Sequence, residues 1–584
     1  MSISTYLPFL QWSRSYNRNK LGGDLLASII VTVMLIPQSL AYAMLAGLPP
    51  VTGLYASIAP LLAYTLLGTS RTLSVGPVAV VSLMTAAAVT QVAAPGSAEY
   101  ASAALLLALI SGVFLFVLGV LRLGFLTNLI SHPVITGFIT ASGILIAVSQ
   151  LKHVLGIEAQ GHSLVSIFQS LWINSGGINA ATLLIGIGSI GILLYARSTL
   201  VSHLAATRLS NSLASLLVKL TPALIVVFTT IIVALFELNK RGVKVVGLIP
   251  SGFPSLSLPG SDLNLWYQLL PAAALISVIG YVESISVGQT LAAKRRERID
   301  PDQELIGLGT ANVASALSGG FPVTGGFSRS VVNYDAGAKT PMAGAFAAVA
   351  IALSTLYLTG LFQFLPIVTL AATIIVAVLS LIDIEAIQRC FRYSKSDFTS
   401  MILTIVVTLF GGVEAGVISG VLVSLLLHLW RTSRPHIAVL GRIEGTEHFR
   451  NIHRHNVVTN EKILSLRVDE SLYFANARYL ENTIYQLIAE DQNIEHVVLM
   501  CSAVNEIDGS ALESLETISE QLKETDVTLH LSEVKGPVTD RLSKSHFMEN
   551  LTGTIFLSHH EAISSIEYFI EKDVHGMELA HASA

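Results

Sequence analysis

The sequence predicts a polytopic α-helical membrane protein that carries a small soluble α/β domain after its last membrane segment. Of its 584 residues, 52% are hydrophobic and only 12% are charged, and the mean hydropathy is +0.66. A soluble protein has about 25% charged residues, so most of this chain must lie in lipid. Charges are sparse from about Gly22 to Leu429 and ordinary for a soluble domain from His436 onward. The net charge of -5 is the sum over a membrane part and a soluble part, so it says little about binding partners.

Apolar segments of membrane-spanning length recur as far as Trp430. Clear examples are residues 22–46, 101–121, 178–195, 221–238, 269–287, 342–358 and 412–430. Residues 74–89 and the run after Phe327 are too short or too interrupted to cross alone. The count is roughly twelve to fourteen segments, because a window of ~20 residues cannot resolve half-helices.

The basic residues predict the orientation in the membrane. Residues 14–20 form a basic flank before the first apolar run, which favours a cytoplasmic N-terminus. That run is too long for a signal-peptide core and lacks a convincing cleavage site, so we expect a retained helix. With fourteen spans, most other basic residues, including the cluster at 294–298, fall on the cytoplasmic side; Lys152 and residues 240–244 do not. We therefore expect a multi-pass protein of the cell (inner) membrane with a cytoplasmic C-terminal domain.

Two interruptions of the apolar pattern occupy corresponding positions in the two halves of the chain. Ser74-Val75-Gly76-Pro77 opens into VAVVSLM, and Thr324-Gly325-Gly326 opens into FSRSVV. Each could be a simple kink or loop end. Paired broken segments, however, are typical of transporters built from inverted repeats, with substrate held at the midplane between half-helices.

Arg329 lies just after the second interruption. A cation at bilayer depth costs at least ~2.5 kcal/mol, so it is seldom there without a partner or a task. A helix that begins near Phe327 would point its unpaired amides and the positive end of its dipole toward the same region. Amide donors together with a guanidinium group make an anion site.

The residues after Pro435 alternate between strand and helix patterns. Strands are expected at 462–468, 496–500, 527–534 and 554–558, with two amphipathic helical segments among them. This alternation predicts one small α/β domain over 436–572, followed by a flexible tail at 573–584. The two cysteines, Cys390 and Cys501, are expected to be reduced, with no disulfide framework and no metal cluster.

Several long motifs resemble the sulfate permease (SulP) family of anion transporters, whose animal branch is solute carrier family 26. They are PQSLAYAMLAGLPPVTGLYASIAPLLAYTLLGTSRTLSVGP (37–77), ISHPVITGF (130–138), YVESISV with Glu283, QELIGLGTANVASALSGGFPVTGGFSRS (303–330) and AGAKTP (336–341). In the C-terminal domain, YFANARYLE, IDGSALESL and EVKGPV resemble the STAS domain that such permeases carry. The resemblance covers nearly the whole chain.

The resemblance implies about fourteen membrane segments in two inverted repeats of seven, forming a core bundle that moves against a gate bundle, and a homodimer. The implied organisation is an N-terminal cytoplasmic segment at 1–20 and a transport domain at 21–434, with repeats at about 21–200 and 215–434. The STAS domain would serve dimerisation and regulation, with a possible regulatory partner. Its turn Asp508-Gly509-Ser510-Ala511 lacks the glycine that follows the phosphorylatable serine in related antagonists, which argues against phosphorylation.

The resemblance also implies a set of substrate-binding residues and an ion-coupling position. The substrate-binding set is Gln38, Tyr42, Gly76, Pro77, Val78, Gly326, Phe327, Ser328 and Arg329, and the coupling residue is Glu283. In physical terms, hydroxyl, amide and backbone N–H donors can replace the water around an oxyanion. Tyr42 and Phe327 are expected to be walls rather than ligands. Arg329 either touches the anion or only neutralises Glu283.

The nature of the anion sets the energetic requirement. Moving a dianion such as sulfate into a cell at about -100 mV costs roughly 4.6 kcal/mol, so accumulation needs a co-transported cation. We expect proton-coupled sulfate uptake by an elevator-like mechanism, with H⁺, possibly Na⁺, as the coupling ion at Glu283 and no other cofactor. The alternatives are Na⁺-coupled bicarbonate or dicarboxylate transport, and a passive chloride channel or exchanger. The sequence contains no metal-ligand cluster, nucleophile–base pair or nucleotide loop, which argues against an enzyme, and no nucleic-acid partner is expected.

Overall fold

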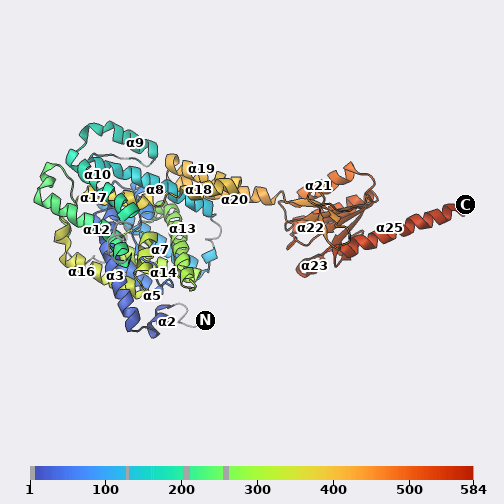
Figure 1. Ribbon diagram of the computed structural model, residues 1–584, viewed down its shortest axis with the longest axis horizontal. Coiled ribbons are helices and arrows are strands. Elements are labelled where there is room, and N and C mark those ends of the chain that lie inside the picture. Colours follow the sequence, from blue (N-terminus) through green and yellow to red (C-terminus); the bar gives the residue numbers. More distant parts are fainter. Residues whose placement is uncertain are drawn as a thin grey trace. The chain divides into compact units, whose positions relative to one another are not determined.

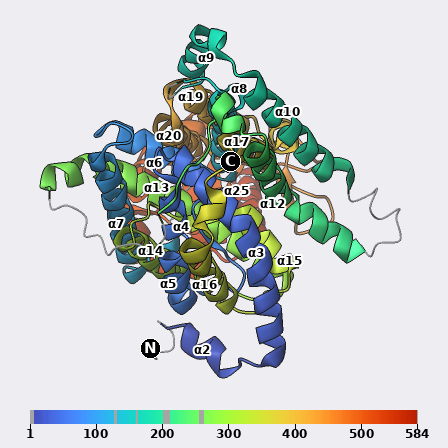
Figure 2. The ribbon, with the colours of Figure 1, turned by 90° about the vertical axis from the view of Figure 1, so that its left-hand side faces the viewer.

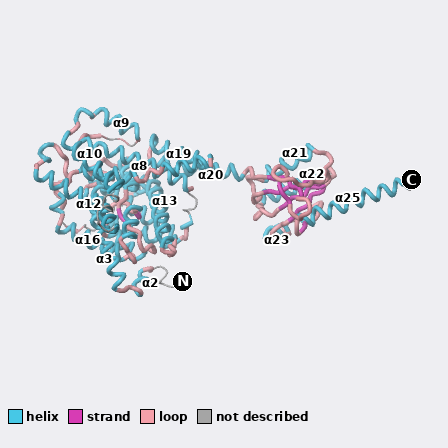
Figure 3. The backbone as a smooth tube through the Cα atoms, in the orientation of Figure 1, coloured by secondary structure: helices cyan, strands magenta, loops and turns pink. Residues whose placement is uncertain are grey.

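The chain folds into a helical unit, Met1–Ser424, and a second unit, Leu425–Ala584, that contains a β-sheet. Figures 1 and 3 show the helices of the first unit and the strands of the second. The computed structural model describes residues 7–125, 131–159, 161, 163–200, 211–250, 252–253 and 262–582, without the side chains of 200, 211–219 and 573–582. The side chains of the expected flexible tail, 573–584, thus lie outside the described residues. The sequence prediction of a helical membrane protein with a small α/β domain is confirmed.

The helices up to the unit boundary follow the apolar segments of the sequence. They are α2 (Phe9–Arg14), α3 (Arg18–Leu45), α4 (Pro50–Tyr55), α5 (Ala59–Leu67), α6 (Ala79–Thr90), α7 (Ala98–Val120), α8 (His132–Leu155), α9 (Leu164–Ile173), α10 (Ala180–Tyr195), α12 (Asn211–Leu235), α13 (Leu263–Lys294), α14 (Pro301–Leu317), α15 (Phe327–Asp335), α16 (Met342–Tyr357), α17 (Ile367–Leu379), α18 (Ile384–Tyr393), α19 (Lys395–Gly411) and α20 (Val413–Thr432). Among the described residues, 8 helical stretches are long and apolar enough to cross a membrane, and shorter apolar helices accompany them. The count of fourteen spans and the inverted repeats stay predictions.

The two interruptions of the apolar pattern meet in space. Val75–Gly76 (β1) pairs in antiparallel fashion with Thr324–Gly325 (β2), so that Val75 lies opposite Gly325. All four residues are buried. Because α6 and α15 begin directly after these strands, the pairing brings the N-termini of two short helices together inside the unit.

Helices α7 and α14 pack with their backbones in contact, and they lie side by side in Figure 2. A Cβ atom built on Gly309 of α14 would lie 2.6 Å from the backbone nitrogen of Phe116 and 2.8 Å from the carbonyl of Gly112. Small residues allow such close approach in membranes, where helix association depends on van der Waals packing. These two glycines therefore set the separation of the two helices.

A buried carboxylate fixes the loop that leads into β1. Glu304, near the start of α14, is 1% exposed. It accepts hydrogen bonds from the Tyr64 hydroxyl at 2.7 Å and from the backbone amides of Thr69 and Ser70 at 2.7 and 2.9 Å. The Thr69 hydroxyl donates a further bond at 2.5 Å. A buried charge that is fully hydrogen bonded is held in one geometry, so this loop has a defined path.

Asp24 of α3 has the same role for the loop after α15. This carboxylate is fully buried and accepts from the backbone amides of Lys339 and Thr340 at 2.6 and 3.0 Å. The Thr340 hydroxyl donates to its second oxygen at 2.6 Å. Two buried acids thus anchor the loop before β1 and the loop after α15, on either side of the paired strands β1 and β2.

The second unit is built around a six-stranded sheet with the order β4-β3-β5-β6-β7-β8. The strands are β3 (Ile437–Arg442), β4 (Phe449–Asn451), β5 (Ile463–Val468), β6 (His496–Met500), β7 (Thr528–Ser532) and β8 (Ile555–Phe556), and the helices are α21 (Ala477–Glu490), α22 (Gly509–Glu524), α23 (Gly536–Leu542), α24 (Phe547–Asn550) and α25 (His559–Ala582). The four strands expected from the sequence are β5 to β8, which pair in parallel. The antiparallel β3 and β4 were not foreseen.

The polar groups in the interior of this sheet domain are structural. His559 lies between the hydroxyls of Ser465 and Ser532, at 2.6 and 2.7 Å. Burial lowers the pKa of His559 to about 4, so the ring is neutral at physiological pH. Burial also raises the pKa of the Cys501 thiol to about 12, which makes this cysteine a poor nucleophile.

The α7–α14 contact can be tested with one substitution. Gly309→Ala places a methyl group against the backbone of α7, and we expect a loss of about 1–3 kcal/mol, the range for overpacking. Thermal unfolding in detergent measures it. Gly188→Ala on α10 is the matched control, because a Cβ there meets nothing within 4 Å. An unchanged midpoint for Gly309→Ala would contradict the close packing.

Candidate functional site

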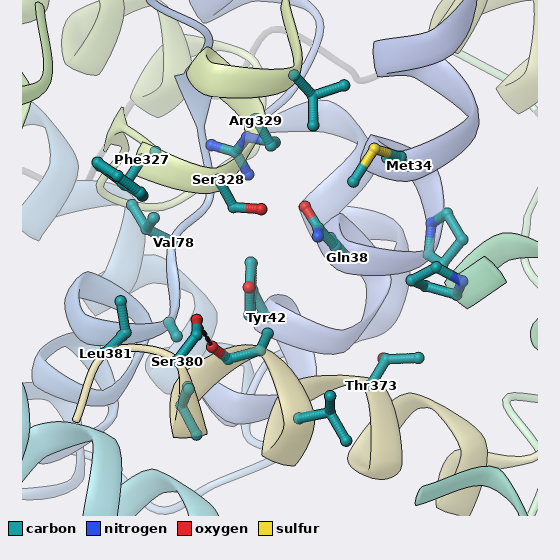
Figure 4. A pocket seen from close by; sticks show the side chains of 18 of the residues that line it. Met34, Gln38, Tyr42, Val78, Phe327, Ser328, Arg329, Thr373, Ser380 and Leu381 are labelled. Atoms are coloured by element: carbon teal, nitrogen blue, oxygen red, sulfur yellow. Dashed lines mark hydrogen bonds between the residues drawn. The ribbon is translucent and has the colours of Figure 1, made fainter. Parts of the chain in front are cut away.

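A cavity of about 490 Å³ lies where α3, α6, α13, α15 and α17 converge. Eight of the ten residues singled out in the sequence line it: Gln38, Tyr42, Val78, Glu283, Gly326, Phe327, Ser328 and Arg329. Figure 4 shows the polar side chains of α3 and α15 facing one another across it. Residues that are 289 positions apart, counting from Gln38 to Phe327, thus meet in one space.

The remaining two predicted residues lie behind the cavity wall. Gly76 and Pro77 are not among the lining residues, but Pro77 bonds to Arg329 and Gly76 leaves room for its guanidinium. Pro77 has no N–H group, and its carbonyl oxygen accepts a hydrogen bond from the arginine. A Cβ on Gly76 would lie 3.4 Å from the arginine Nη2 atom. These two residues therefore position the cation.

Two helix N-termini open into the cavity without caps. Val78 and Gly326 are the N-cap residues of α6 and α15, and neither side chain accepts a hydrogen bond from the first turn. The first amides of a helix have no partner within the helix, and the positive end of its dipole lies at the same place. The cavity is consequently bordered on two sides by uncapped helix starts with partial positive charge, an arrangement that suits an anion.

Arg329 is a buried cation with unused donors. Its side chain is 2% exposed, and Nη1 donates to the Pro77 carbonyl at 2.5 Å. Nε and Nη2 are buried and have no hydrogen-bond partner among the described residues. The guanidinium lies against Gly326, where an added Cβ would be 2.9 Å from Nη2. Burying a charge is costly unless it is paired, so this group is poised for an anionic ligand.

Glu283 of α13 lines the same cavity without touching the arginine. Within the described part of the chain, no ion pair joins Glu283 and Arg329 at 4.0 Å or less, and no hydrogen bond to the carboxylate occurs. Glu283 also borders a small apolar void between α8, α13 and α20. The Glu283 carboxylate and the Arg329 guanidinium therefore line one cavity without an ion pair between them. Nε and Nη2 of Arg329 are thus left without an acceptor among the described residues.

The other polar side chains of the predicted set come from α3 and the start of α15. Figure 4 shows the Gln38 amide and the Ser328 hydroxyl on opposite sides of the cavity, with the Tyr42 ring below them. Tyr42 is 7% exposed, whereas Phe327 is 51% exposed. Gln38 follows Pro37, which lies inside α3. An amide and a hydroxyl add neutral donors to the charged one.

A chain of hydroxyl groups holds the strand crossing in place. Ser284 of α13 accepts from the backbone amide of Gly325 at 2.8 Å and bonds to the Thr324 hydroxyl at 2.6 Å. Ser330 of α15 accepts from the amide of Ser74 at 2.9 Å. The positions of both helix starts thus depend on buried hydrogen bonds, which are costly to leave unmade.

The sequence analysis missed several polar residues of the cavity. They are Arg197, Thr221, Thr373 and Ser380, on the π-helical segment η3 (Ala196–Leu200), α12, α17 and the residue after α17. The Arg197 guanidinium donates to the Val376 carbonyl at 3.2 Å, which brings a second cation to the lining. Arg197, Thr373 and Ser380 have no Gly or Pro beside them, whereas Thr221 is followed by Pro222 inside α12. Helix packing brings all four residues to the cavity.

Comparisons with known proteins identify both parts of the chain. The sequence model of the sulfate permease family matches residues 21–404, and that of the STAS domain matches residues 454–562. The chain is 35% identical over 584 residues to sulfate transporter 4.1, chloroplastic, of Arabidopsis thaliana, covering 97% of this chain and 84% of that protein. It is 32% identical to high affinity sulfate transporter 2 of Stylosanthes hamata, with 97% and 87% covered.

Solved structures share the fold. A structure of SLC26A9 superposes with a TM-score of 0.88 at 24% identity, covering 98% of this chain and 94% of that one. The transmembrane domain of the cyanobacterial bicarbonate transporter BicA gives a TM-score of 0.60 at 21% identity, covering 70% of this chain and 98% of that one. At these identities the likeness establishes the fold alone.

The hydroxyl network offers a test of the site's architecture. Ser284→Ala removes the acceptor of a buried backbone amide, and we expect a loss of about 1–3 kcal/mol of stability. Thermal unfolding of the purified protein measures it, with Ser286→Ala as control because Ser286 lies on the same helix and is exposed. Equal midpoints for the two variants would show that the crossing does not depend on Ser284.

Proposed function

Because the chain belongs to the sulfate permease family, we propose that it is a secondary active transporter that takes up sulfate together with protons. Its relatives are named transporters, so the protein is a transporter rather than an enzyme. The proposal assigns the anion to the cavity between the starts of α6 and α15, and the coupling ion to Glu283. The names of the relatives support sulfate as the anion.

One observation carries the proposal. Arg329 is buried beside two uncapped helix starts and keeps Nε and Nη2 without partners. In the absence of a ligand this arrangement costs free energy, because a buried donor without a partner loses its hydration. An anion in the cavity would supply the missing acceptor and the missing negative charge. The site therefore favours a small oxyanion over a neutral or cationic solute.

The same geometry is suited to release as well as binding. A transporter must hold its substrate firmly enough to replace water and weakly enough to let it go. Here one guanidinium, already bonded to Pro77, is combined with neutral donors from Gln38 and Ser328. A dianion would be partly neutralised rather than fully paired, which keeps its dissociation feasible.

Proton coupling follows from the electrical cost of a dianion. At a membrane potential of about -100 mV, entry of two negative charges costs roughly 4.6 kcal/mol, so uptake needs an accompanying cation. Glu283 lines the cavity, has no hydrogen bond or ion pair within the described part of the chain, and is near enough to respond to the anion's field. We propose that it takes up the proton that accompanies sulfate, and that a core bundle then carries both across in an elevator-like movement.

The alternatives are separated by one experiment. Na⁺-coupled bicarbonate or dicarboxylate transport and a passive chloride pathway would use the same scaffold. Uptake of labelled sulfate and bicarbonate into proteoliposomes, under an imposed pH or Na⁺ gradient, distinguishes them. Sulfate accumulation driven by an inward proton gradient supports the proposal. Accumulation driven only by Na⁺, or chloride flux without any gradient coupling, would contradict it.

Arg329 provides a prediction for binding. Arg329→Ala should weaken sulfate binding by about 1.5–3 kcal/mol, the range for a charge-assisted hydrogen bond. That corresponds to a roughly 10- to 150-fold loss in affinity. Arg329→Lys should recover part of the loss, because the charge returns without the planar fork. Equilibrium binding of labelled sulfate in detergent measures both variants.

A double variant distinguishes the ligand role of Arg329 from simple neutralisation of Glu283. If the arginine only neutralised the acid, Glu283→Gln would restore binding to Arg329→Ala. We expect nearly additive losses in the double-mutant cycle, because no ion pair joins the two groups in the described residues. Strong recovery of sulfate binding in the double variant would contradict a ligand role for Arg329.

Glu283→Gln provides a separate prediction for coupling. The amide keeps the size of the side chain but cannot take up a proton, so binding and exchange should persist while proton-driven accumulation disappears. Counterflow exchange and gradient-driven uptake, measured on the same proteoliposomes, separate the two activities. Undiminished accumulation in Glu283→Gln would move the coupling role to another residue.

A further inference from the structure

A second polar cavity, of about 410 Å³, is separate from the cavity that contains Arg329, the proposed transport cavity. It is enclosed by α2, the loop at 68–72 and the turn between α13 and α14. The two cavities share no lining residue. Three arginines line the second cavity, Arg71, Arg295 and Arg298, together with the acids Glu297 and Asp300. The charges of these side chains decide what kind of ligand fits.

The two acids are already engaged. Glu297 accepts from Arg71 at 3.0 Å. Asp300 caps α14, where it accepts the backbone amides of Asp302 and Gln303 at 3.0 and 3.2 Å. Among the described residues, neither carboxylate accepts a hydrogen bond from Arg295 or Arg298. With three arginines and two acids, the cavity carries an excess of positive charge.

The arginines differ in how they are held. Arg295 donates to the carbonyls of Ala338 and Tyr334 and stacks on the Tyr334 ring, 4.4 Å from its centroid. These partners carry no net charge, so the cation is fixed but not neutralised. Arg298 is exposed and makes no hydrogen bond or ion pair with any described residue. One fixed and one free guanidinium thus border the same space.

A buried donor without a partner belongs to the same cavity. Trp12 of α2 lines it, and the indole N–H is buried with no hydrogen-bond partner in the part of the chain that the structure describes. An unsatisfied buried donor is destabilising, and Trp12 places a fluorescent side chain in the wall of the cavity.

We propose that this cavity is a second anion site, which takes a phosphate group held by Arg71, Arg295 and Arg298. Planar guanidinium forks match phosphate oxygens in geometry and charge, which makes arginine clusters characteristic of phosphate recognition. The phosphate group comes either from a phospholipid headgroup or from a soluble phosphate. The assignment does not depend on which anion the transport cavity carries.

Helix α15 links this second site to the transport cavity. Asn333 of α15 donates to the Thr72 carbonyl at 3.0 Å, so the loop wall is attached to that helix. Arg295 is attached to the same C-terminal end of α15, through the carbonyls of Tyr334 and Ala338. Helix α15 also carries Arg329. A phosphate group that draws the loop at 68–72 and Arg295 together therefore favours one position of α15 over others.

The test uses the full-length protein in phosphatidylcholine nanodiscs and the fluorescence of Trp12. The chain has 4 tryptophans, so the Trp12 signal is obtained by subtracting the emission of Trp12→Phe. One arm titrates inorganic phosphate at constant ionic strength. The other replaces part of the lipid with phosphatidic acid and, for comparison, with phosphatidylglycerol at equal surface charge.

We expect a saturable change of Trp12 emission in at least one arm, with an affinity about tenfold lower in Arg298→Gln, which loses one charge-assisted contact. Arg296→Gln is the matched control, because this neighbouring arginine does not line the cavity. Response to phosphate identifies a soluble ligand, and response to phosphatidic acid alone identifies a lipid headgroup. No saturable change in either arm, or equal affinities in Arg298→Gln and Arg296→Gln, overturns the proposal. Sulfate binding in the transport cavity is measured separately, so failure here leaves the proposed function standing.

Discussion

The buried guanidinium of Arg329, which bonds to the Pro77 carbonyl, is the charge that the surrounding structure must accommodate. A cation in this position is tolerable only if the protein surrounds it with acceptors or reserves it for a ligand. The structure supplies one acceptor, the Pro77 carbonyl, and leaves Nε and Nη2 without partners in the described residues. The pairing of β1 with β2, and the short helices that begin after them, place this partly hydrogen-bonded cation beside two uncapped helix starts. The cost of that arrangement is what an anion would relieve.

Backbone interrupted inside a membrane needs support, and much of the helical unit provides it. The hydroxyls of Ser284 and Ser330 accept the amides of the two interrupted segments. The buried carboxylates of Glu304 and Asp24 fix the loops on either side. Each of these groups satisfies backbone donors that lipid cannot. Elsewhere in the lining, the Arg197 guanidinium donates to the Val376 carbonyl and the Thr373 hydroxyl donates to the Leu370 carbonyl.

The fold class and eight of the residues that line the cavity could be predicted because they leave strong local signals. Long apolar runs indicate membrane helices, and Gly and Pro interruptions next to Arg329 indicate half-helices. The helical membrane fold and the membership of the sulfate permease family are confirmed. Arg197 and Thr373 could not be predicted, because a polar residue on a continuous helix faces the cavity only through tertiary packing. Strand β3 was missed because it begins five residues after the last membrane helix, where the apolar pattern continues, and β4 was missed because it has only three residues. The roles of the cavity residues, the homodimer and the number of spans stay predictions.

The central claim is that the unpartnered donors of Arg329 are the anion's binding site. The most direct measurement is a structure of the full-length protein determined with selenate, a heavier analogue of sulfate whose position anomalous scattering identifies. The account predicts a selenium peak between the starts of α6 and α15, with selenate oxygens within hydrogen-bond distance of Arg329 Nε or Nη2. A peak elsewhere, with Arg329 turned to an ion pair with Glu283, would contradict it.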